Sequence, residues 1–170
     1  MTSPSSSPTG PATGRVLRMG ILGVGVSGAR IARAMTAMPN VELVAAADLR
    51  PKVRHDFEER YGARTYDSAE GICADPDVDA LWISTPNQYH AEHTVLAARS
   101  GKHIIIEKPI AISMEETGRM LEAVERAGVS LVCARAQGGL PPAPGAHAGP
   151  LCVSDTTHSL ARRTEETDDH

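Results

Sequence analysis

Short apolar runs recur along the chain between residues 16 and 133. Most of them lack the strict alternation of apolar and polar positions that marks a half-exposed strand. Continuous apolar runs are typical of strands buried on both faces of a parallel sheet, and most of these runs precede a helical pattern. The pattern therefore predicts an α/β domain with a doubly wound parallel sheet. The expected strands are residues 16–22, 41–48, 63–66, 80–84, 103–106 and 130–133.

Helical spacing marks the segments between these strands. Ile31, Met35 and Met38 fall on one face of a helix, at spacings of four and three residues. Pro51 suits the first turn of another helix, and Gly62 can end that helix. The expected helices are residues 29–38, 51–61, 68–73, 87–100 and 113–127.

Two of these helices carry start signals. Asn87 can cap the N-terminus of one helix through its side chain. Ser113 and Glu116 form the S-x-x-E pattern of a capping box at the start of the other, and Gly128 can end it. The residues expected to face the core from this last helix are Thr117, Met120, Leu121 and Val124.

The composition changes at both ends of the chain. Residues 1–14 are mostly Ser, Pro, Thr and Gly, residues 134–150 are mostly Ala, Gly and Pro, and the chain ends in a mixed charge run. Such segments bury too little apolar surface to order themselves, so we expect disordered tails at 1–14 and 134–170. A linker or a partner-binding segment is the alternative for the second tail. The expected domain spans residues 15–133.

Charge and cysteine usage narrow the class of protein. The net charge of −4 argues against a nucleic-acid-binding surface, which would need a basic stripe. No run approaches the roughly 18 apolar residues of a membrane span. The acidic run 75–79 is predicted to be a turn with solvated carboxylates. Cys73, Cys133 and Cys152 form no C-x-x-C pair. With no secretory signal at the start, these features favour a reduced, cytoplasmic protein that binds neither nucleic acid nor membrane.

A glycine-rich motif follows the first expected strand. Residues 23–28, GVGVSG, have the G-x-G-x-x-G spacing between a strand and a helix. Gly23 would permit a tight turn, Gly25 would let the backbone approach a pyrophosphate, and Gly28 would let helix and strand pack closely. The phosphates would lie on the free N–H groups at the helix start, with Val26 and Ser27 beside them. The motif predicts a Rossmann dinucleotide site.

A carboxylate stands where the adenosine ribose of such a cofactor would lie. Asp48 follows Gly28 by 20 residues and ends the second expected strand. It can accept hydrogen bonds from the ribose and would repel a 2′-phosphate, so it favours NAD over NADP. Arg50 could instead lie over the adenine or pair with a phosphate, which keeps NADP open. The simpler alternative for the motif is a glycine turn with an incidental aspartate.

The loop after the fourth expected strand offers polar groups to the nicotinamide side. Thr85 and Asn87 supply a hydroxyl and an amide, although Pro86 turning the chain and Asn87 capping a helix would explain them equally well. His90 and His93 are three residues apart, a spacing that could bind a metal. No third ligand lies nearby in the sequence, so we expect no metal site.

Lys108 leaves the fifth expected strand at the same edge of the sheet. Oxidation of an alcohol by a nicotinamide moves a hydride and also releases a proton, which needs an acid–base group. A lysine in water is a poor base at neutral pH, but partial burial beside an oxidised nicotinamide would make it a better one. Pro109 restricts the backbone of Lys108 to an extended conformation. The alternative is a surface lysine at a strand exit.

Four stretches of the chain, GILGVGVSGARIA, VAAAD, STPNQYHAEH and GKHIIIEKPIA, together resemble the Gfo/Idh/MocA family of oxidoreductases. The sequence around PNQYHAEH and IIIEKPIAISMEE is similar to that of the dihydroxyphthalate and dihydrodiol dehydrogenase branch of the family. The resemblance implies that this part of the chain binds NAD or NADP and that Lys108 contributes to catalysis and cofactor contact. The residues it implies along the cleft are Gly23, Gly25, Gly28, Asp48, Thr85, Asn87, His90, Glu107 and Pro109.

The resemblance also implies a second domain that this sequence lacks. Members of the family continue into an α/β domain that completes the substrate pocket, and nothing after Cys133 resembles it. We therefore expect a truncated NAD(P)-dependent oxidoreductase, inactive alone, that would take a small-molecule substrate if a second domain were supplied. The alternatives are a non-enzymatic NAD(P)-binding module and an inactive fragment. A homo-oligomer is left open, as is the identity of the substrate.

Overall fold

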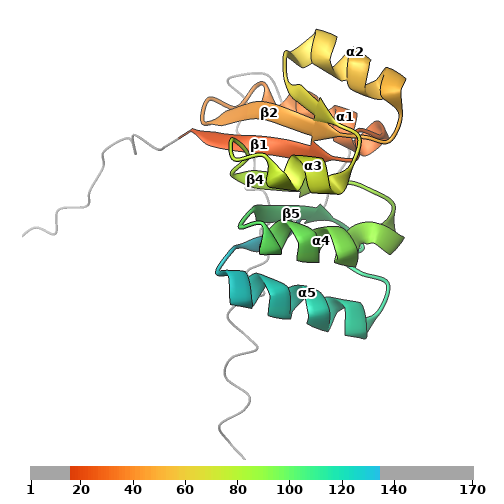
Figure 1. Cartoon of the computed structure of the whole chain (residues 1–170), viewed down its shortest axis with the longest axis vertical. Helices are drawn as coiled ribbons and strands as arrows, with labels where there is room; N and C mark the ends of the chain where they lie inside the picture. Colours follow the sequence, from red (N-terminus) through yellow and green to blue (C-terminus); the bar gives the residue numbers. More distant parts are fainter. Residues whose placement is uncertain (1–15, 135–170) are drawn as a thin grey trace, which may run out of the picture.

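The computed structural model describes residues 16–134 (Figure 1). All six strands are parallel and form one sheet in the order β3-β2-β1-β4-β5-β6, which confirms the predicted doubly wound fold. The strands are β1 Leu17–Leu22, β2 Val41–Ala47, β3 Arg64–Tyr66, β4 Ala80–Ile83, β5 His103–Glu107 and β6 Leu131–Ala134. The helices are α1 Val26–Met35, α2 Pro51–Tyr61, α3 Ala69–Ala74, α4 His90–Arg99 and α5 Met114–Ala127, with a 3₁₀ turn at Asn87–Tyr89.

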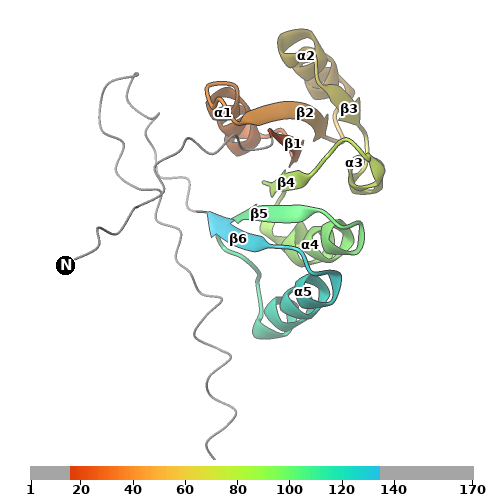
Figure 2. The same cartoon turned by 90° about the vertical axis from the view of Figure 1, so that its left-hand side faces the viewer.

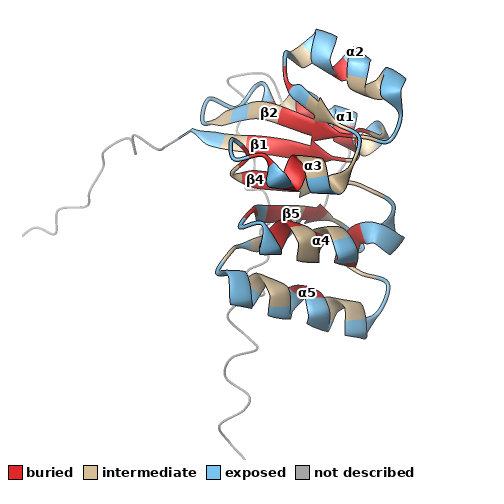
Figure 3. Ribbon diagram, viewed as in Figure 1, coloured by how far each residue is buried: buried red, intermediate tan, exposed pale blue. Residues whose placement is uncertain are grey.

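Helices pack against both faces of the sheet. Helices α3, α4 and α5 lie on one face and α1 and α2 on the other, as the two views show together (Figures 1 and 2). The central strands are buried between the layers (Figure 3). Leu81 and Ile83 of β4 pack in the cluster that contains Met120 of α5, whereas Ala80 packs with Phe57 of α2. Burial on both faces explains why these strands lack polar alternation.

Three predicted details of the helices were wrong. Helix α1 begins at Val26, directly after the glycine loop, and ends at Met35, so Met38 lies outside it and is exposed. Asn87 makes no capping bond with its side chain, because residues 87–89 form a 3₁₀ turn closed by the bond from Tyr89 N to Pro86 O. Leu121 is exposed on α5, where Met120 is the fully buried residue.

The residues predicted to end α2 and to begin and end α5 do so in the structure. Gly62 and Gly128 end α2 and α5 with φ values of 64° and 65°, in the left-handed region that glycine adopts without strain. At the start of α5, Ser113 Oγ accepts a 3.1 Å hydrogen bond from Glu116 N. The reciprocal bond runs from Ile112 N to Glu116 Oε2, one residue ahead of the usual partner in a capping box.

We had expected the carboxylates of the acidic turn at 75–79 to be solvated, but they have partners within the protein. Asp75 is only 5% exposed, and its carboxylate accepts hydrogen bonds from Arg64 and from the Tyr66 hydroxyl. Asp79 pairs with Arg18 at 2.8 Å. The signal was missed because these partners come from other strands, β3 for Asp75 and β1 for Asp79, and a residue pattern does not show which side chains meet. We refer to a set of linked residues as the amino-edge network, because apart from Tyr66 they lie near the starts of β1, β3 and β5 or in the loop before β4. Tyr66 ends β3 and joins the set through its hydroxyl bond to Asp75. The network contains Arg18, Arg64, Tyr66, Asp75, Asp77, Asp79 and Lys102.

Lys102 completes the amino-edge network from the start of β5. Its buried ammonium donates to the carbonyl oxygens of Asp75 at 2.6 Å and Val78 at 2.8 Å. A buried ammonium is tolerated when its donors are used in this way. The network therefore ties the loop before β4 to β3 and β5.

The predicted tails fall almost entirely outside the described residues. Ala134, which we had placed in the second tail, pairs with Glu107 as the last residue of β6. Within residues 16–134, no helix has both the length and the apolar character needed to cross a bilayer. The same residues contain no group of three or more His, Cys, Asp or Glu side chains arranged to hold a metal ion.

Candidate dinucleotide site

The predicted site residues gather at the carboxyl ends of the central strands. Leu22 of β1 is in register with Ala47 of β2 and with Ile83 of β4, so the loops after these three strands begin at one edge of the sheet. The chain leaves β1 into α1 on one face and leaves β4 into α4 on the other (Figure 2). Open α/β sheets bind ligands at such a point, where the direction of winding changes.

Gly23 and Gly28 are required by close backbone packing. Gly23 has φ of +94°, and a Cβ atom there would lie 2.9 Å from Thr85 N. A Cβ atom at Gly28 would overlap the carbonyl oxygen of Gly23. That carbonyl also accepts a 2.7 Å hydrogen bond from Ser84 Oγ, a contact that no sequence pattern had suggested. The loop is thus held tightly against the end of β4.

Gly25, in contrast, faces open space. A Cβ atom built there meets nothing within 4 Å. Gly25 is the N-cap residue of α1, makes no side-chain capping bond, and is followed by the exposed Val26. The first turn of α1 contains no acidic residue, so no carboxylate of its own occupies the positive end of the helix. The arrangement fits a pyrophosphate, which such helix ends bind.

Asp48 follows β2 and lies beside the glycine loop. Its Oδ2 accepts a hydrogen bond from Val24 N at 3.1 Å, and its Oδ1 accepts one from Arg50 N at 3.0 Å. The Arg50 guanidinium adds two more, from Nε to Oδ1 at 2.8 Å and from Nη2 to Oδ2 at 2.9 Å. The Arg50 side chain holds the pKa of the Asp48 carboxyl below its usual value, against the opposing effect of burial. The carboxylate is therefore ionised at neutral pH.

Glu107 connects the glycine loop with the end of β5. Its Oε2 accepts a 2.9 Å hydrogen bond from the Ser27 hydroxyl in the first turn of α1. Its Oε1 is buried and has no hydrogen-bond partner among the described residues. A buried oxygen without a donor is costly, so a ligand hydroxyl at this place would satisfy it.

His90 joins the two loops that follow β4 and β5. The ring is 1% exposed, and its Nε2 lies 2.9 Å from Thr85 O while its Nδ1 lies 2.8 Å from Pro109 O. Both ring nitrogens thus face protein carbonyl oxygens. The structure gives His90 a role in shaping the site and leaves neither nitrogen free for a ligand.

Thr85 and its neighbour His93 form a second contact in this region. Thr85 Oγ1 lies 3.0 Å from His93 Nδ1, and the His93 ring stacks on Tyr89 with a centroid distance of 5.7 Å. Burial lowers the pKa of His93, so the ring is neutral at physiological pH. His93 had been considered only as a metal ligand, and its spacing from His90 did not indicate this pairing.

Lys108 lies at the site edge but is exposed. Within residues 16–134 its ammonium makes no hydrogen bond or ion pair. The partial burial that we had expected around it is therefore not supplied by these residues. Pro86, Asn87 and Pro109 are exposed at the same edge.

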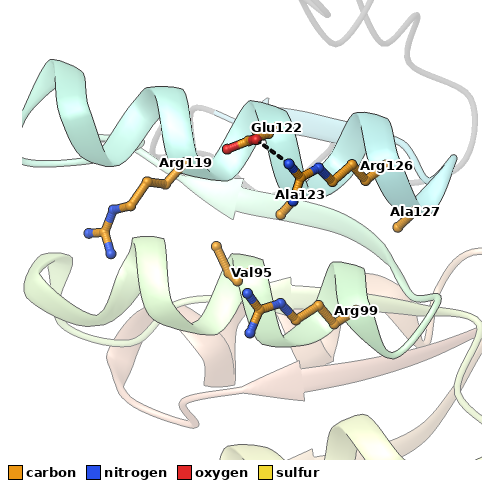
Figure 4. Close-up of a pocket in the computed structure, with 7 residues that line it drawn as sticks. All are labelled: Val95, Arg99, Arg119, Glu122, Ala123, Arg126 and Ala127. Atoms are coloured by element: carbon orange, nitrogen blue, oxygen red, sulfur yellow. Dashed lines mark hydrogen bonds and ion pairs between the residues drawn. The ribbon is translucent and has the colours of Figure 1, made fainter.

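A separate groove of about 440 Å³ lies between α4 and α5 (Figure 4). It contains none of the predicted site residues. Arg126 pairs with Glu122 at 2.6 Å and Arg119 pairs with Glu116 at 4.0 Å, so two of the three arginines that line the groove already have carboxylate partners. We assign the candidate site to the strand ends. The groove is lined by Val95, Arg99, Arg119, Glu122, Ala123, Arg126 and Ala127.

Comparisons with known proteins identify relatives that share this domain. The 1-carboxy-3-chloro-3,4-dihydroxycyclohexa-1,5-diene dehydrogenase of Comamonas testosteroni is 34% identical over 117 residues, which cover 68% of this chain and 30% of that protein. The WlbA dehydrogenase of Bordetella pertussis, solved with NADH and UDP-GlcNAcA, is 31% identical with a TM-score of 0.68, over 71% of this chain and 37% of that one.

A third relative was solved with the other nicotinamide cofactor. A 3-ketoreductase from Actinomadura kijaniata, in complex with NADP and TDP-benzene, is 29% identical with a TM-score of 0.66, over 69% of this chain and 36% of that one. The chain thus spans about a third of the length of these relatives. A model of the oxidoreductase family with an NAD-binding Rossmann fold matches residues 17–134. The chain therefore belongs to the Gfo/Idh/MocA family of oxidoreductases and contains its NAD(P)-binding domain.

Proposed function

We propose that residues 16–134 bind a nicotinamide dinucleotide for an oxidoreductase that transfers hydride to or from a CH–OH group. The observation that carries the proposal is the glycine loop. Gly23 and Gly28 have no room for a side chain, whereas Gly25 faces open space at the positive end of α1. This combination is what a bound pyrophosphate requires of the loop.

The other site residues fit the remaining parts of such a cofactor. Asp48 supplies a carboxylate at the adenosine ribose, and the unpartnered Oε1 of Glu107 supplies an acceptor for a hydroxyl of the second ribose. We propose NAD as the first cofactor and NADP as the alternative, because Arg50 could pair with a 2′-phosphate. Val26, Ser27, Thr85, Pro86, Asn87 and Pro109 remain proposed contacts along the cleft, and His90 is proposed to shape it.

Lys108 is the proposed acid–base residue. When bound, the oxidised nicotinamide would supply the two-electron hydride acceptor needed to oxidise the carbinol C–H bond of an alcohol. A neutral Lys108 amine would take the hydroxyl proton as the C=O bond forms, and the resulting ammonium would return a proton in the reverse reaction. Pro109 O and His90 support this role because their contact fixes the loop that carries Lys108.

The substrate is proposed to be a cyclic secondary alcohol, of the diol type named for the Comamonas testosteroni relative. Turnover would require the part of the family fold that this chain does not span. The exposure of Lys108 favours one alternative, a module that binds the cofactor without catalysing turnover. The test uses a protein with a complete substrate domain and a panel of cyclic diols and polyols. If that protein binds the cofactor but turns over none of these compounds, the alternative is supported.

Cofactor binding is tested by titration with NAD and with NADP. Calorimetry measures the affinity, and thermal unfolding measures the shift in melting temperature. A ligand that binds the folded state raises the melting temperature. Gly25→Val should abolish binding, because its side chain would fill the space left for the pyrophosphate. Gly118→Val is the matched control, since Gly118 of α5 also faces open space. Equal binding by the two variants would show that the glycine loop is not the site.

A further inference from the structure

The carboxylate of Asp48 is saturated with donors. Val24 N and Arg50 N each donate to one of its oxygens, and the Arg50 guanidinium donates to both. An ionised carboxylate offers about four lone-pair sites. All four are therefore used within the protein, and none is left for a ribose hydroxyl.

The four donors differ in how easily they can leave. The two backbone N–H groups are fixed, because Val24 belongs to the glycine loop and Arg50 N precedes the first turn of α2. The guanidinium is held by side-chain torsions alone. The Arg50 side chain is 62% exposed, whereas that of Asp48 is 8% exposed. Most of the Arg50 side chain is therefore already in solvent, and it can turn away by breaking its contact with Asp48 while Asp48 stays in place.

A second arginine keeps the loop in position when Arg50 moves. Arg54 Nη1 donates to Asp48 O at 2.8 Å and to Leu49 O at 3.2 Å. These bonds hold the backbone of the loop and do not involve the Asp48 carboxylate. The guanidinium of Arg50 is thus a removable partner on a fixed acceptor.

We propose that Arg50 sets the cofactor preference of this site by competing with the adenosine ribose for Asp48. An NAD ribose gains the two lone pairs only after Arg50 has left them, which weakens NAD binding. The displaced guanidinium then becomes available to a 2′-phosphate, where its charge offsets the repulsion between that phosphate and the Asp48 carboxylate. The inference rests on the proposed function, because it assigns roles within that cofactor site.

The competition is expected to be modest for NAD and larger for NADP. An ion pair with one exposed partner is weak, so its loss should strengthen NAD binding by about two- to fivefold. A guanidinium bonded to a phosphate contributes more, so its loss should weaken NADP binding by about tenfold or more. Two changes of opposite sign distinguish competition from a general loss of positive charge, which would weaken both cofactors.

The test is calorimetric titration of NAD and NADP into the wild type, Arg50→Ala and Lys52→Ala. Lys52 is the matched control because it lies in the first turn of α2, two residues after Arg50, and pairs with Asp56, away from Asp48. We expect tighter NAD and weaker NADP binding in Arg50→Ala, and little change in Lys52→Ala. The NAD gain should disappear when Arg50→Ala is combined with Asp48→Asn, since the carboxylate to be freed is then absent.

Two outcomes would overturn the inference. Unchanged or weaker NAD binding in Arg50→Ala would mean that Arg50 does not compete with the ribose. Unchanged NADP binding would mean that it does not serve the 2′-phosphate. Failure of the proposed function appears differently, as absence of binding of either cofactor to the wild type.

Discussion

The hydroxyl of Ser27 donates a 2.9 Å hydrogen bond to the carboxylate of Glu107, and this bond joins the glycine loop to the end of β5. The two residues are 80 positions apart in the sequence. Because the other oxygen of Glu107 has no partner among the described residues, Ser27 provides the one hydrogen bond of this carboxylate there. The contact holds the glycine loop beside the end of β5, from which the chain continues to Lys108.

Ser27→Ala should lower the free energy of unfolding by about 0.5–1.5 kcal/mol, the usual net contribution of a hydrogen bond, because this one is only partly buried. Urea unfolding of the chain measures the change. Ser100→Ala, at an exposed position after α4, is the control and should cost much less. Equal losses in the two variants would mean that the Ser27 bond contributes nothing to stability.

Lys108→Ala should separate cofactor binding from turnover. We expect its cofactor affinity to stay near that of the wild type, because the glycine loop and Asp48 do not contact Lys108. Turnover is best measured in a chimera that joins residues 16–134 to the substrate domain of an active relative. There Lys108→Ala should reduce the rate about a hundredfold or more, the usual effect of losing an acid–base group.

Lys52→Ala in the same chimera is the control for removal of a lysine, since its partner Asp56 lies on the surface of α2. If the chimeras carrying Lys108→Ala and Lys52→Ala turned over substrate at equal rates, Lys108 would be a surface residue at the end of β5 without a chemical function. Preservation of the cofactor affinity in both variants shows that the fold is intact.

Asp75 should make the stability of the domain depend on acidic pH. Burial disfavours its charged form, but hydrogen bonds from Asp77 N, Tyr66 and Arg64 outweigh burial and keep its pKa below the usual value. A carboxyl whose pKa is lower in the folded state stabilises the fold above its unfolded pKa of about 3.9. This contribution is lost as the pH falls below that value, through the folded pKa.

The measurement is the urea midpoint of the wild type and of Asp75→Asn from about pH 6 down to about pH 2.5. The wild type should lose stability more steeply than the variant at the acidic end. Asp56→Asn, at an exposed surface pair, should follow the wild type. Parallel curves for the wild type and Asp75→Asn would contradict the assignment of the acid sensitivity to Asp75.

The fold and the glycine loop could be predicted because their signals are local. A run such as Ile104–Ile106 or a turn such as Gly23–Gly28 encodes its structure within a few residues, and the strand order follows from right-handed crossovers. Asp48 was predicted for the same reason, from its distance to the loop. Its saturation by Arg50 could not be predicted, since that depends on the rotamer of one long side chain.

The missed features depend on side-chain placement and local geometry that residue patterns do not encode. The burial of Asp75 requires Arg64, Tyr66 and the loop before β4 to meet at one corner of the sheet. Asn87 was expected to cap a helix, but the chain after Pro86 turns first as a 3₁₀ segment. The surroundings of Lys108 differ from the expectation because residues 16–134 leave this loop uncovered.

Apart from Tyr66, whose carbonyl oxygen accepts a hydrogen bond from Asp48 N, the amino-edge network lies at the opposite end of the strands from the candidate dinucleotide site. Its ion pairs between Arg18 and Asp79 and between Arg64 and Asp75 share no residue with the loops after β1, β2 and β4. Substitutions that retune cofactor choice at Asp48 or Arg50 therefore leave these pairs untouched. The domain can accept new ligand preferences at one edge while its resistance to unfolding is maintained at the other, which makes it a suitable scaffold for engineering cofactor use.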